Sequence, residues 1–544
     1  MMQHRWPVVG FGTLWLVLIA GPGLAVGGEL LPPDRPVEQV VDHYVNQRLA
    51  GAGVAAAPVA DDANLQRRTL LDLVGRIPTA AETQAYLADS SPDKRVRLVD
   101  RWLNSPAYVS HQANEFDRML TPDSKGGMRE YLLQAFQEQR PWDQMFREMM
   151  LGRDDDPEQK GALQFVRTRA ADLDKLTNET SVLFFGVNIS CAQCHDHPLA
   201  PEWTQHHFYG MKSFFARTFE NGGFVGEREY GLVTFESVDG EKHDADLMFF
   251  TGTTIDEPKN EEPTDEQKKA EKQRLEEWKK NKQAPEPPSF SRRAQLVEVA
   301  LRQGENNYFA RAIVNRVWYR LFGFGLVNPI DQMHPDNPAS HPELLEWLAR
   351  DLVAHQYDLS RLTRGLLLSD AYARSSVWSE SQRPDPSLFA VANVRPLSAH
   401  QYATTLRLAS TNPDWFGSDV SAEEVDKRLQ AAENAARGFA GQIEQPNEDF
   451  QVSTLEALYF SNNDRFRREF LRTGGDSLIG KLMATEDVAE RVTTAYGTVF
   501  NRAPTDEERA AVEAYFAERT DDREAACRQV VWALLTSSEC RFNY

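Results

Sequence analysis

Apolar residues recur along most of the chain three or four positions apart, the spacing that places them on one face of an α-helix. The clearest case is Phe309, Ile313, Val317 and Leu321, which predicts a helix with a continuous apolar face that ends at Gly323. We expect such stripes to form the protein core and not to line a cofactor site.

Local signals mark the starts of several helices. A threonine followed three residues later by a glutamate is a capping box, and a proline is favoured in the first turn of a helix. The signals are Thr79 with Glu82, Ser91 with Pro92, His341 with Pro342, and Thr505 with Glu508. The second helix should bury Val96, Val99 and Leu103, and the third Leu345, Leu348 and Leu352.

Residues 224–251 depart from the helical pattern. The β-favouring runs 230–235 and 245–250 flank Asp239-Gly240, which predicts a small β-hairpin. Residues 257–288 are rich in Lys, Glu and Pro and offer almost nothing to bury, so they predict a solvated linker with a transient helix around 266–280.

These patterns together predict a mainly α protein with two helical domains. The first helical domain covers residues 35–218, a β-hairpin region follows at 219–255, and a charged linker at 256–290 leads to the second helical domain at 291–544. The length of 544 residues agrees with more than one domain, because a single core rarely serves a chain this long.

The charge balance limits the choice of partners. Lys and Arg total 60 against 81 Asp and Glu, which gives a formal net charge of -21. A surface this acidic repels phosphate backbones, so we expect no nucleic-acid partner.

The N-terminus predicts export. Arg5 precedes the apolar run 8–20, Pro22 and Gly23 interrupt that run, and Ala25 opens a small-residue cleavage site. We therefore expect residues 1–27 to be a signal peptide, with cleavage favoured over retention as an anchor. No later stretch is apolar enough to cross a bilayer, which predicts a periplasmic or otherwise extracytoplasmic protein without a stable membrane span after cleavage.

The chain has only four cysteines, and they fall into two pairs. Cys527 and Cys540 lie near the C-terminus among residues without evident chemistry, so in an oxidising compartment we expect them to form a disulfide. Cys191 and Cys194 belong to a C-x-x-C-H sequence that ends at His195.

The C-x-x-C-H spacing is typical of covalent haem attachment. Under this interpretation, Cys191 and Cys194 form thioethers with haem c and His195 is the axial ligand of the iron. Phenylalanines near the motif would supply an apolar wall beside the haem, and several side chains are candidates for the sixth ligand. The wall candidates are Phe184, Phe185, Phe208, Phe214 and Phe215, and the ligand candidates are Met211, His206, His207 and Met248.

Two alternatives stay open for the same residues. Cys191, Cys194, His195 and His197 approach a ligand set for zinc or another transition metal, with His206 or His207 as a remote ligand. Alternatively, no cofactor is bound and Cys191 and Cys194 form a disulfide within a scaffold protein.

Polar residues elsewhere in the chain give weaker signals. Arg316 lies on the long apolar-faced helix and is expected to pair with a structural carboxylate. We assign no role to His400, and helix capping accounts for His341. No familiar motif of a hydrolase or a phosphate-binding loop occurs, so the sequence leaves open whether the protein is an enzyme.

The motifs occur in an order that resembles a known pair of domains. The N-terminal half is similar to the cytochrome-c-like domain named from planctomycete bacteria (domain of unknown function 1549), and the C-terminal half to its usual partner (domain of unknown function 1553). The matching segments are 71–79, 105–108, 191–198 and Trp203 in the first half, then 315–318, 322–327, 341–349, 369–372, 395–399, 502–505 and 532–539. One departure lies beside the motif, where Leu199-Ala200 replaces the usual Phe and carboxylate.

The resemblance implies a haem-like motif and an extracytoplasmic setting without an established reaction. We therefore expect a c-type-haem-like redox or ligand-sensing component that works with a redox or enzyme partner. The alternatives are a metal-binding or accessory protein that works with exported polymer-degrading enzymes, and a structural scaffold with a C-x-x-C disulfide.

Overall fold

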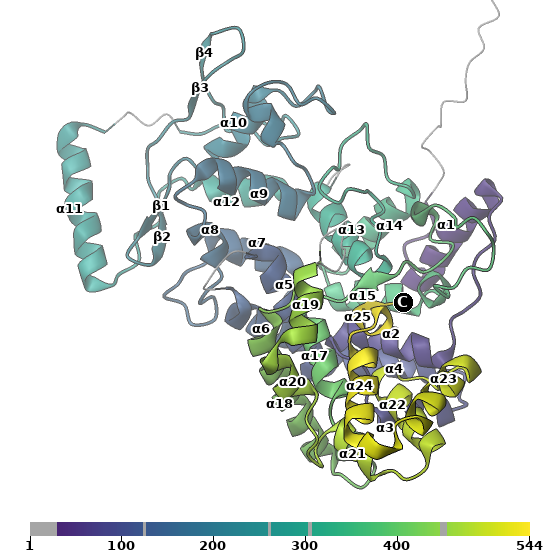
Figure 1. The fold of residues 1–544 in the computed structure, drawn as a ribbon. Helices are drawn as coiled ribbons and strands as arrows, with labels where there is room; N and C mark the ends of the chain where they lie inside the picture. The colour runs from purple at the N-terminus through teal and green to yellow at the C-terminus, as the bar shows by residue number, and fades with distance from the viewer. Residues whose placement is uncertain (1–29, 123–126, 259–262, 303–306, 447–453) are drawn as a thin grey trace, which may run out of the picture.

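The computed structural model describes residues 30–122, 127–258, 263–302, 307–446 and 454–544 of the chain. The predicted signal peptide at 1–27 lies outside the described residues. The described chain is mainly helical and contains three small sheets of two strands each, which confirms the predicted fold class (Figure 1).

The first part of the chain folds into ten α-helices and one short 3₁₀ helix. They are α1 (Val37–Ala52), α2 (Asp62–Val74), α3 (Ala80–Ala88), α4 (Lys94–Leu103), α5 (Pro106–Leu120), α6 (Arg129–Gln137), α7 (Trp142–Leu151), α8 (Gln164–Arg167), α9 (Leu173–Phe185), η1 (Ser190–Gln193) and α10 (Gln205–Ser213). The capping box of Thr79 and Glu82 forms as predicted. Helix α4 buries Leu98, Val99 and Trp102, whereas Val96 is exposed, so its predicted inner face was partly wrong.

Two β-hairpins follow α10. Strands β1 (Thr218–Asn221) and β2 (Phe224–Glu227) pair antiparallel around Gly222 and Gly223, both of which have positive φ. Strands β3 (Thr234–Glu236) and β4 (Lys242–Asp244) pair around Asp239-Gly240, which confirms the predicted hairpin at this turn. The second strand forms at 242–244, ahead of the run 245–250 in which it was expected. The β1–β2 hairpin has no strong alternation of apolar and polar residues, and the sequence did not reveal it.

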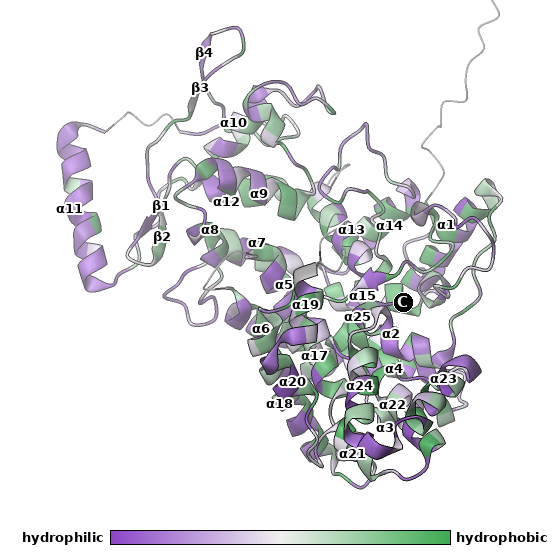
Figure 2. Ribbon diagram, in the orientation of Figure 1, coloured by the Kyte–Doolittle hydropathy of each residue, from purple (hydrophilic) through white to green (hydrophobic). Residues whose placement is uncertain are grey.

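The predicted charged linker contains a long helix, α11 (Asp265–Asn281), which has no buried residue. It stands apart from the body of the protein in Figure 1, and Figure 2 shows it polar on most of its surface. A capping box of Thr264 and Gln267 and lysines in the last turn stabilise its ends. The helix is therefore maintained by local signals, with few contacts to the rest of the chain.

Helices α12 to α16 complete the upper part of the molecule in Figure 1. They are α12 (Arg292–Ala300), α13 (Tyr308–Phe322), α14 (Pro342–Ala354), α15 (Leu359–Leu368) and α16 (Asp370–Ala373). All four predicted apolar residues of α13 are buried, and the helix ends at Gly323 with φ 74°. The predicted inner face of α14 is also buried.

The C-terminal part forms a second group of helices, seen in green and yellow in Figure 1. They are α17 (Ala399–Ala409), α18 (Ala422–Ala440), α19 (Thr454–Asn462), α20 (Asp464–Phe470), α21 (Leu478–Ala484), α22 (Val488–Val499), α23 (Asp506–Ala517), α24 (Arg523–Leu535) and α25 (Ser538–Arg541). The short strands β5 (Arg395–Pro396) and β6 (Phe542–Asn543) pair antiparallel and bring the C-terminus back to the start of this group.

The buried apolar residues form two clusters. The first runs from Val37 to Val391, and the second from Leu397 to Cys540 with Leu71 and Ile77 added from the N-terminal half. Residues 256–290 thus lead from one part of the first cluster to another. The predicted domain boundaries stay a prediction, but the packing divides near residues 391–397.

A buried polar network joins the two clusters. Asp72 on α2 accepts two hydrogen bonds from the guanidinium of Arg395, at 2.9 and 2.7 Å. It also accepts from the Tyr372 hydroxyl at 2.7 Å and from Asn543 Nδ2 at 3.1 Å. Each acceptor position of this buried carboxylate is therefore used, which offsets the cost of burying its charge.

Candidate functional site

The C-x-x-C-H motif lies in the connection between α9 and α10, on the 3₁₀ helix η1. Helix α9 ends at Gly186, whose φ of 68° reverses the chain. The side chain of Asn188 then accepts hydrogen bonds from the Ser190 backbone N–H at 3.1 Å and hydroxyl at 2.7 Å, which starts η1. The Cys194 N–H donates to the Cys191 carbonyl at 3.4 Å, so one tight turn holds both thiols.

Gln193, between the two cysteines, anchors the motif to the neighbouring helices. Its side-chain amide donates to Asp174 of α9 at 3.0 Å, and its carbonyl accepts from Gln205 and Tyr209 of α10, both at 3.3 Å. Ala192 is buried beneath the turn. The motif thus lies at the surface and is held in place by hydrogen bonds to α9 and α10.

The three predicted attachment and ligand residues are all solvent-exposed. Cys191 and Cys194 are exposed free thiols, so the predicted disulfide between them does not form in the structure. The imidazole of His195 is exposed, and its Nδ1 lies 2.7 Å from the Asp196 carbonyl. No described residue hydrogen-bonds to Nε2 of His195, which leaves this nitrogen available to a metal or a haem iron.

His197 has a different environment and does not join the motif as a ligand. It is 4% exposed and lies against Trp203. The Leu199 N–H donates to its Nδ1 at 3.3 Å, so its proton lies on Nε2, which donates to the Asn188 carbonyl at 3.1 Å. Burial lowers the pKa of His197. Both ring nitrogens are occupied by the backbone, and the predicted four-residue metal set is therefore not assembled.

The remote metal and haem ligands proposed from the sequence are also engaged elsewhere. Nδ1 of His207 accepts from the Thr204 N–H at 3.1 Å, while His206 contacts the rings of Phe235 and His243. Met211 is fully buried, and Met248 packs against Gly210. In the part of the chain that the structure describes, no three His, Cys, Asp or Glu side chains gather in a way that could hold a metal ion.

The predicted aromatic wall is part of the core. The five phenylalanines, Phe184, Phe185, Phe208, Phe214 and Phe215, are each at most 1% exposed and belong to the first apolar cluster. They support the motif from below and leave no apolar surface of their own beside Cys194. The two thiols and the His195 imidazole are the exposed groups of the motif that could hold a haem.

The disulfide expected between the two C-terminal cysteines is absent from the described structure. Cys527 and Cys540 are both buried free thiols. Cys527 lies in the second turn of α24 and Cys540 in α25, and the predicted disulfide between them does not form in the structure. Burial raises the pKa of Cys540 to about 12, which keeps it protonated.

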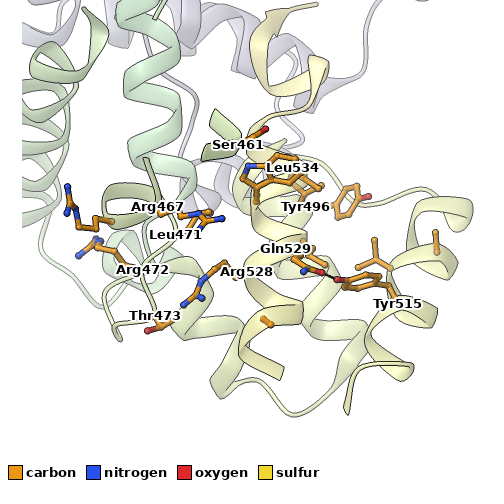
Figure 3. A pocket seen from close by; sticks show the side chains of 17 residues that line it. Ser461, Arg467, Leu471, Arg472, Thr473, Tyr496, Tyr515, Arg528, Gln529 and Leu534 are labelled. Carbon is orange, nitrogen blue, oxygen red and sulfur yellow. Dashed lines mark hydrogen bonds between the residues drawn. The ribbon is translucent and has the colours of Figure 1, made fainter. Parts of the chain in front are cut away.

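The larger cavities of the described chain lie away from the motif. One of about 1340 Å³ opens among α20, α22, α23 and α24 in the second cluster (Figure 3). Arg472 and Arg528, two of its arginines, are paired with Asp476 and Glu524. Cys191, Cys194 and His195 line none of the larger cavities among the described residues.

Comparison with known families agrees with the order of the motifs. Residues 40–220 match the family PSCyt2, a protein of unknown function (DUF1549), and residues 292–449 match PSD1, a protein of unknown function (DUF1553). The chain carries these two domains in this order. The C-x-x-C-H motif lies within the residues that match DUF1549, and the described residues that match DUF1553 contribute to both apolar clusters.

Other comparisons add nothing to this assignment. No curated protein and no solved structure matches the chain. Among the described residues, no helix is both long and apolar enough to cross a bilayer.

Proposed function

We propose that the DUF1549 domain carries a covalently attached haem c and that the exported protein acts as a redox or ligand-sensing component. The observation that supports this most is the combination of two exposed free thiols on one turn with an adjacent imidazole whose Nε2 has no partner among the described residues. A haem held there would supply one-electron chemistry or a site for small ligands.

The protein's own contribution would be to position these three groups. The contact between Nδ1 of His195 and the Asp196 carbonyl fixes the ring, with its proton on Nδ1, and directs Nε2 outward. The hydrogen bonds of Gln193 with Asp174 and Tyr209 hold the turn that carries the two thiols. The exposure of the motif favours exchange with a partner protein, since a buried haem edge is a poor donor of electrons.

A pyridine haemochrome spectrum tests this function. The full chain is exported from a host that has cytochrome c maturation, together with Cys191→Ala and, as a matched control, Cys527→Ala. We expect a haem c spectrum in the wild type and in Cys527→Ala, and its loss in Cys191→Ala. A colourless wild-type protein under these conditions would contradict the proposal.

A further inference from the structure

Another cavity, of about 460 Å³ and lined by several polar side chains, lies between the two apolar clusters. Helices α2, α4 and α5 form one side, and α17 and α18 the other. The Ser110 hydroxyl of α5 donates to Glu433 of α18 at 2.5 Å and ties the two sides together. The volume is within the range of small-molecule sites, and such sites are common where domains meet.

Three polar atoms at this cavity are buried without a hydrogen-bond partner among the described residues. They are Nδ1 and Nε2 of His400 and Nδ2 of Asn114, and both residues line the cavity. Leaving a buried donor or acceptor unsatisfied costs about 1–3 kcal/mol for each group. Three such atoms around one cavity indicate that a polar molecule completes them.

The other groups at the cavity favour an anion. Arg437 lines it and forms a hydrogen bond only with Asn434 among the described residues, with no carboxylate in ion-pair contact. Arg101 also lines the cavity, and its guanidinium lies 5.0 Å from the ring centroid of Trp102, likewise without an ion pair. Two guanidiniums without an ion pair and the unsatisfied Asn114 amide supply donors at the cavity. Of the two carboxylates that line it, Glu433 accepts a hydrogen bond from Ser110 and Asp426 is exposed to solvent.

His111 closes the inner end of the cavity. It is 3% exposed, and a Cβ on Gly75 would lie only 2.4 Å from its Nδ1, so the ring has no room to move toward α2. Burial lowers its pKa to about 4, so it is neutral at pH 7. A neutral imidazole can donate to an anion without adding a second fixed charge.

We propose that this cavity binds a small molecule that bears a carboxylate or phosphate group, with its oxyanion toward Arg437, Asn114 and His400. The apolar part of the ligand lies against Trp102 and Leu429, which line the same cavity. The site is separate from the C-x-x-C-H motif and does not depend on haem.

Calorimetric titration of the full chain with succinate and, separately, with inorganic phosphate tests this site at constant ionic strength. We expect saturable binding of at least one anion with a Kd of about 1 mM or lower. The anion that binds identifies the headgroup. If neither gives saturable heat up to about 20 mM, the cavity is filled by water and the proposal is wrong.

Two variants and one matched control keep the test specific. Arg437→Gln on the half-buried face of α18 should weaken binding at least tenfold, as should His400→Phe, which removes both orphaned nitrogens. Arg428→Gln removes an arginine of the same helix that is paired with Glu424, outside the cavity, and should bind as the wild type does. Equal binding by Arg437→Gln and Arg428→Gln, with unchanged melting temperatures, would overturn the assignment.

Discussion

The C-x-x-C-H motif and the cavity between the two clusters are built in opposite ways. The motif takes all its functional groups from five consecutive residues, and they project into solvent from a fixed base. The cavity assembles His111, Asn114, His400 and Arg437 from three helices, and side-chain nitrogens of Asn114 and His400 are buried there. The first kind of site is visible in a sequence, whereas the second exists only after the chain has folded.

This difference predicts that the two sites respond separately to damage. Loosening the contact between the clusters should abolish the cavity without affecting haem attachment. Changing groups around the motif should affect the haem without affecting anion binding. The following predictions test this separation.

The largest effect is expected from Asp72→Ala. This change leaves the buried Arg395 guanidinium without its carboxylate and removes an acceptor of Tyr372 and Asn543. We expect a loss of about 3–5 kcal/mol in the free energy of unfolding, measured by urea denaturation. Anion binding should weaken, while the haem content per protein should stay unchanged. A parallel loss of haem would show that the two sites are coupled.

Acid should destabilise the protein through His111. Its pKa is about 4 in the folded state and 6.5 in a model peptide, so between these values the unfolded chain binds the extra proton. The contribution of His111 to the free energy of unfolding is therefore fully present above pH 6.5. It is lost as the pH drops toward 4, by about 3 kcal/mol in all. Urea denaturation at pH 7 and pH 5 measures the loss.

His111→Gln should make the pH dependence shallower, whereas the exposed His43→Gln should leave it unchanged. His341, whose pKa burial also lowers to about 4, contributes with the same sign and remains in both variants. The same slope in His111→Gln and His43→Gln would contradict a buried neutral imidazole at the cavity.

A moderate effect is expected from His197→Ala. The change removes an imidazole that donates to Asn188 and accepts from Leu199, which leaves backbone groups unsatisfied. The free energy of unfolding should fall by about 1–3 kcal/mol. The haem content should be that of the wild type, because backbone groups already occupy both ring nitrogens of His197. Loss of a bound metal in this variant would instead support the four-residue metal set.

The smallest effect is expected at α11. Glu271 is its link to Arg228 and Tyr230 beside the hairpins, at a partly exposed position. Glu271→Ala should change the free energy of unfolding by less than about 1 kcal/mol and leave both sites intact. A larger change, detected in the same urea titration, would mean that α11 is part of the core.

Much of the fold follows from short-range signals in the sequence. The capping boxes at Thr79 and Thr505 form as predicted, since a side chain and a backbone three residues away suffice. The apolar face of α13 is buried because its spacing matches the helical period. The helix in the charged linker has local capping signals of the same kind, at Thr264 and Gln267.

Contacts between side chains that are distant in the sequence could not be predicted as well. Arg316 was expected to meet a carboxylate, but it donates to the carbonyls of Val182 and Leu183 near the end of α9. That choice depends on which helix packs beside α13, and the sequence does not encode it in any local pattern. His400 was given no role from the sequence. In the structure it lines the cavity together with Asn114 and Glu433, which are distant from it in the chain.

The C-x-x-C-H segment contains both residues that the sequence identified and residues whose position only the fold decides. Cys191, Cys194 and His195 are exposed, whereas His197, two residues further, is buried beside Trp203. The phenylalanines expected to enclose a haem instead fill the core. Spacing identified the reactive groups, but only packing could show which of them face solvent.

The intact mass of the denatured protein, exported from a host with cytochrome c maturation, tests the central claim most directly. We predict that the wild type carries the added mass of one haem that survives denaturation, and that the double variant Cys191→Ala/Cys194→Ala, which has no thiol for a thioether at the motif, has the mass of the polypeptide alone. A wild-type mass equal to that of the polypeptide alone would contradict the claim that the C-x-x-C-H motif is a haem attachment site.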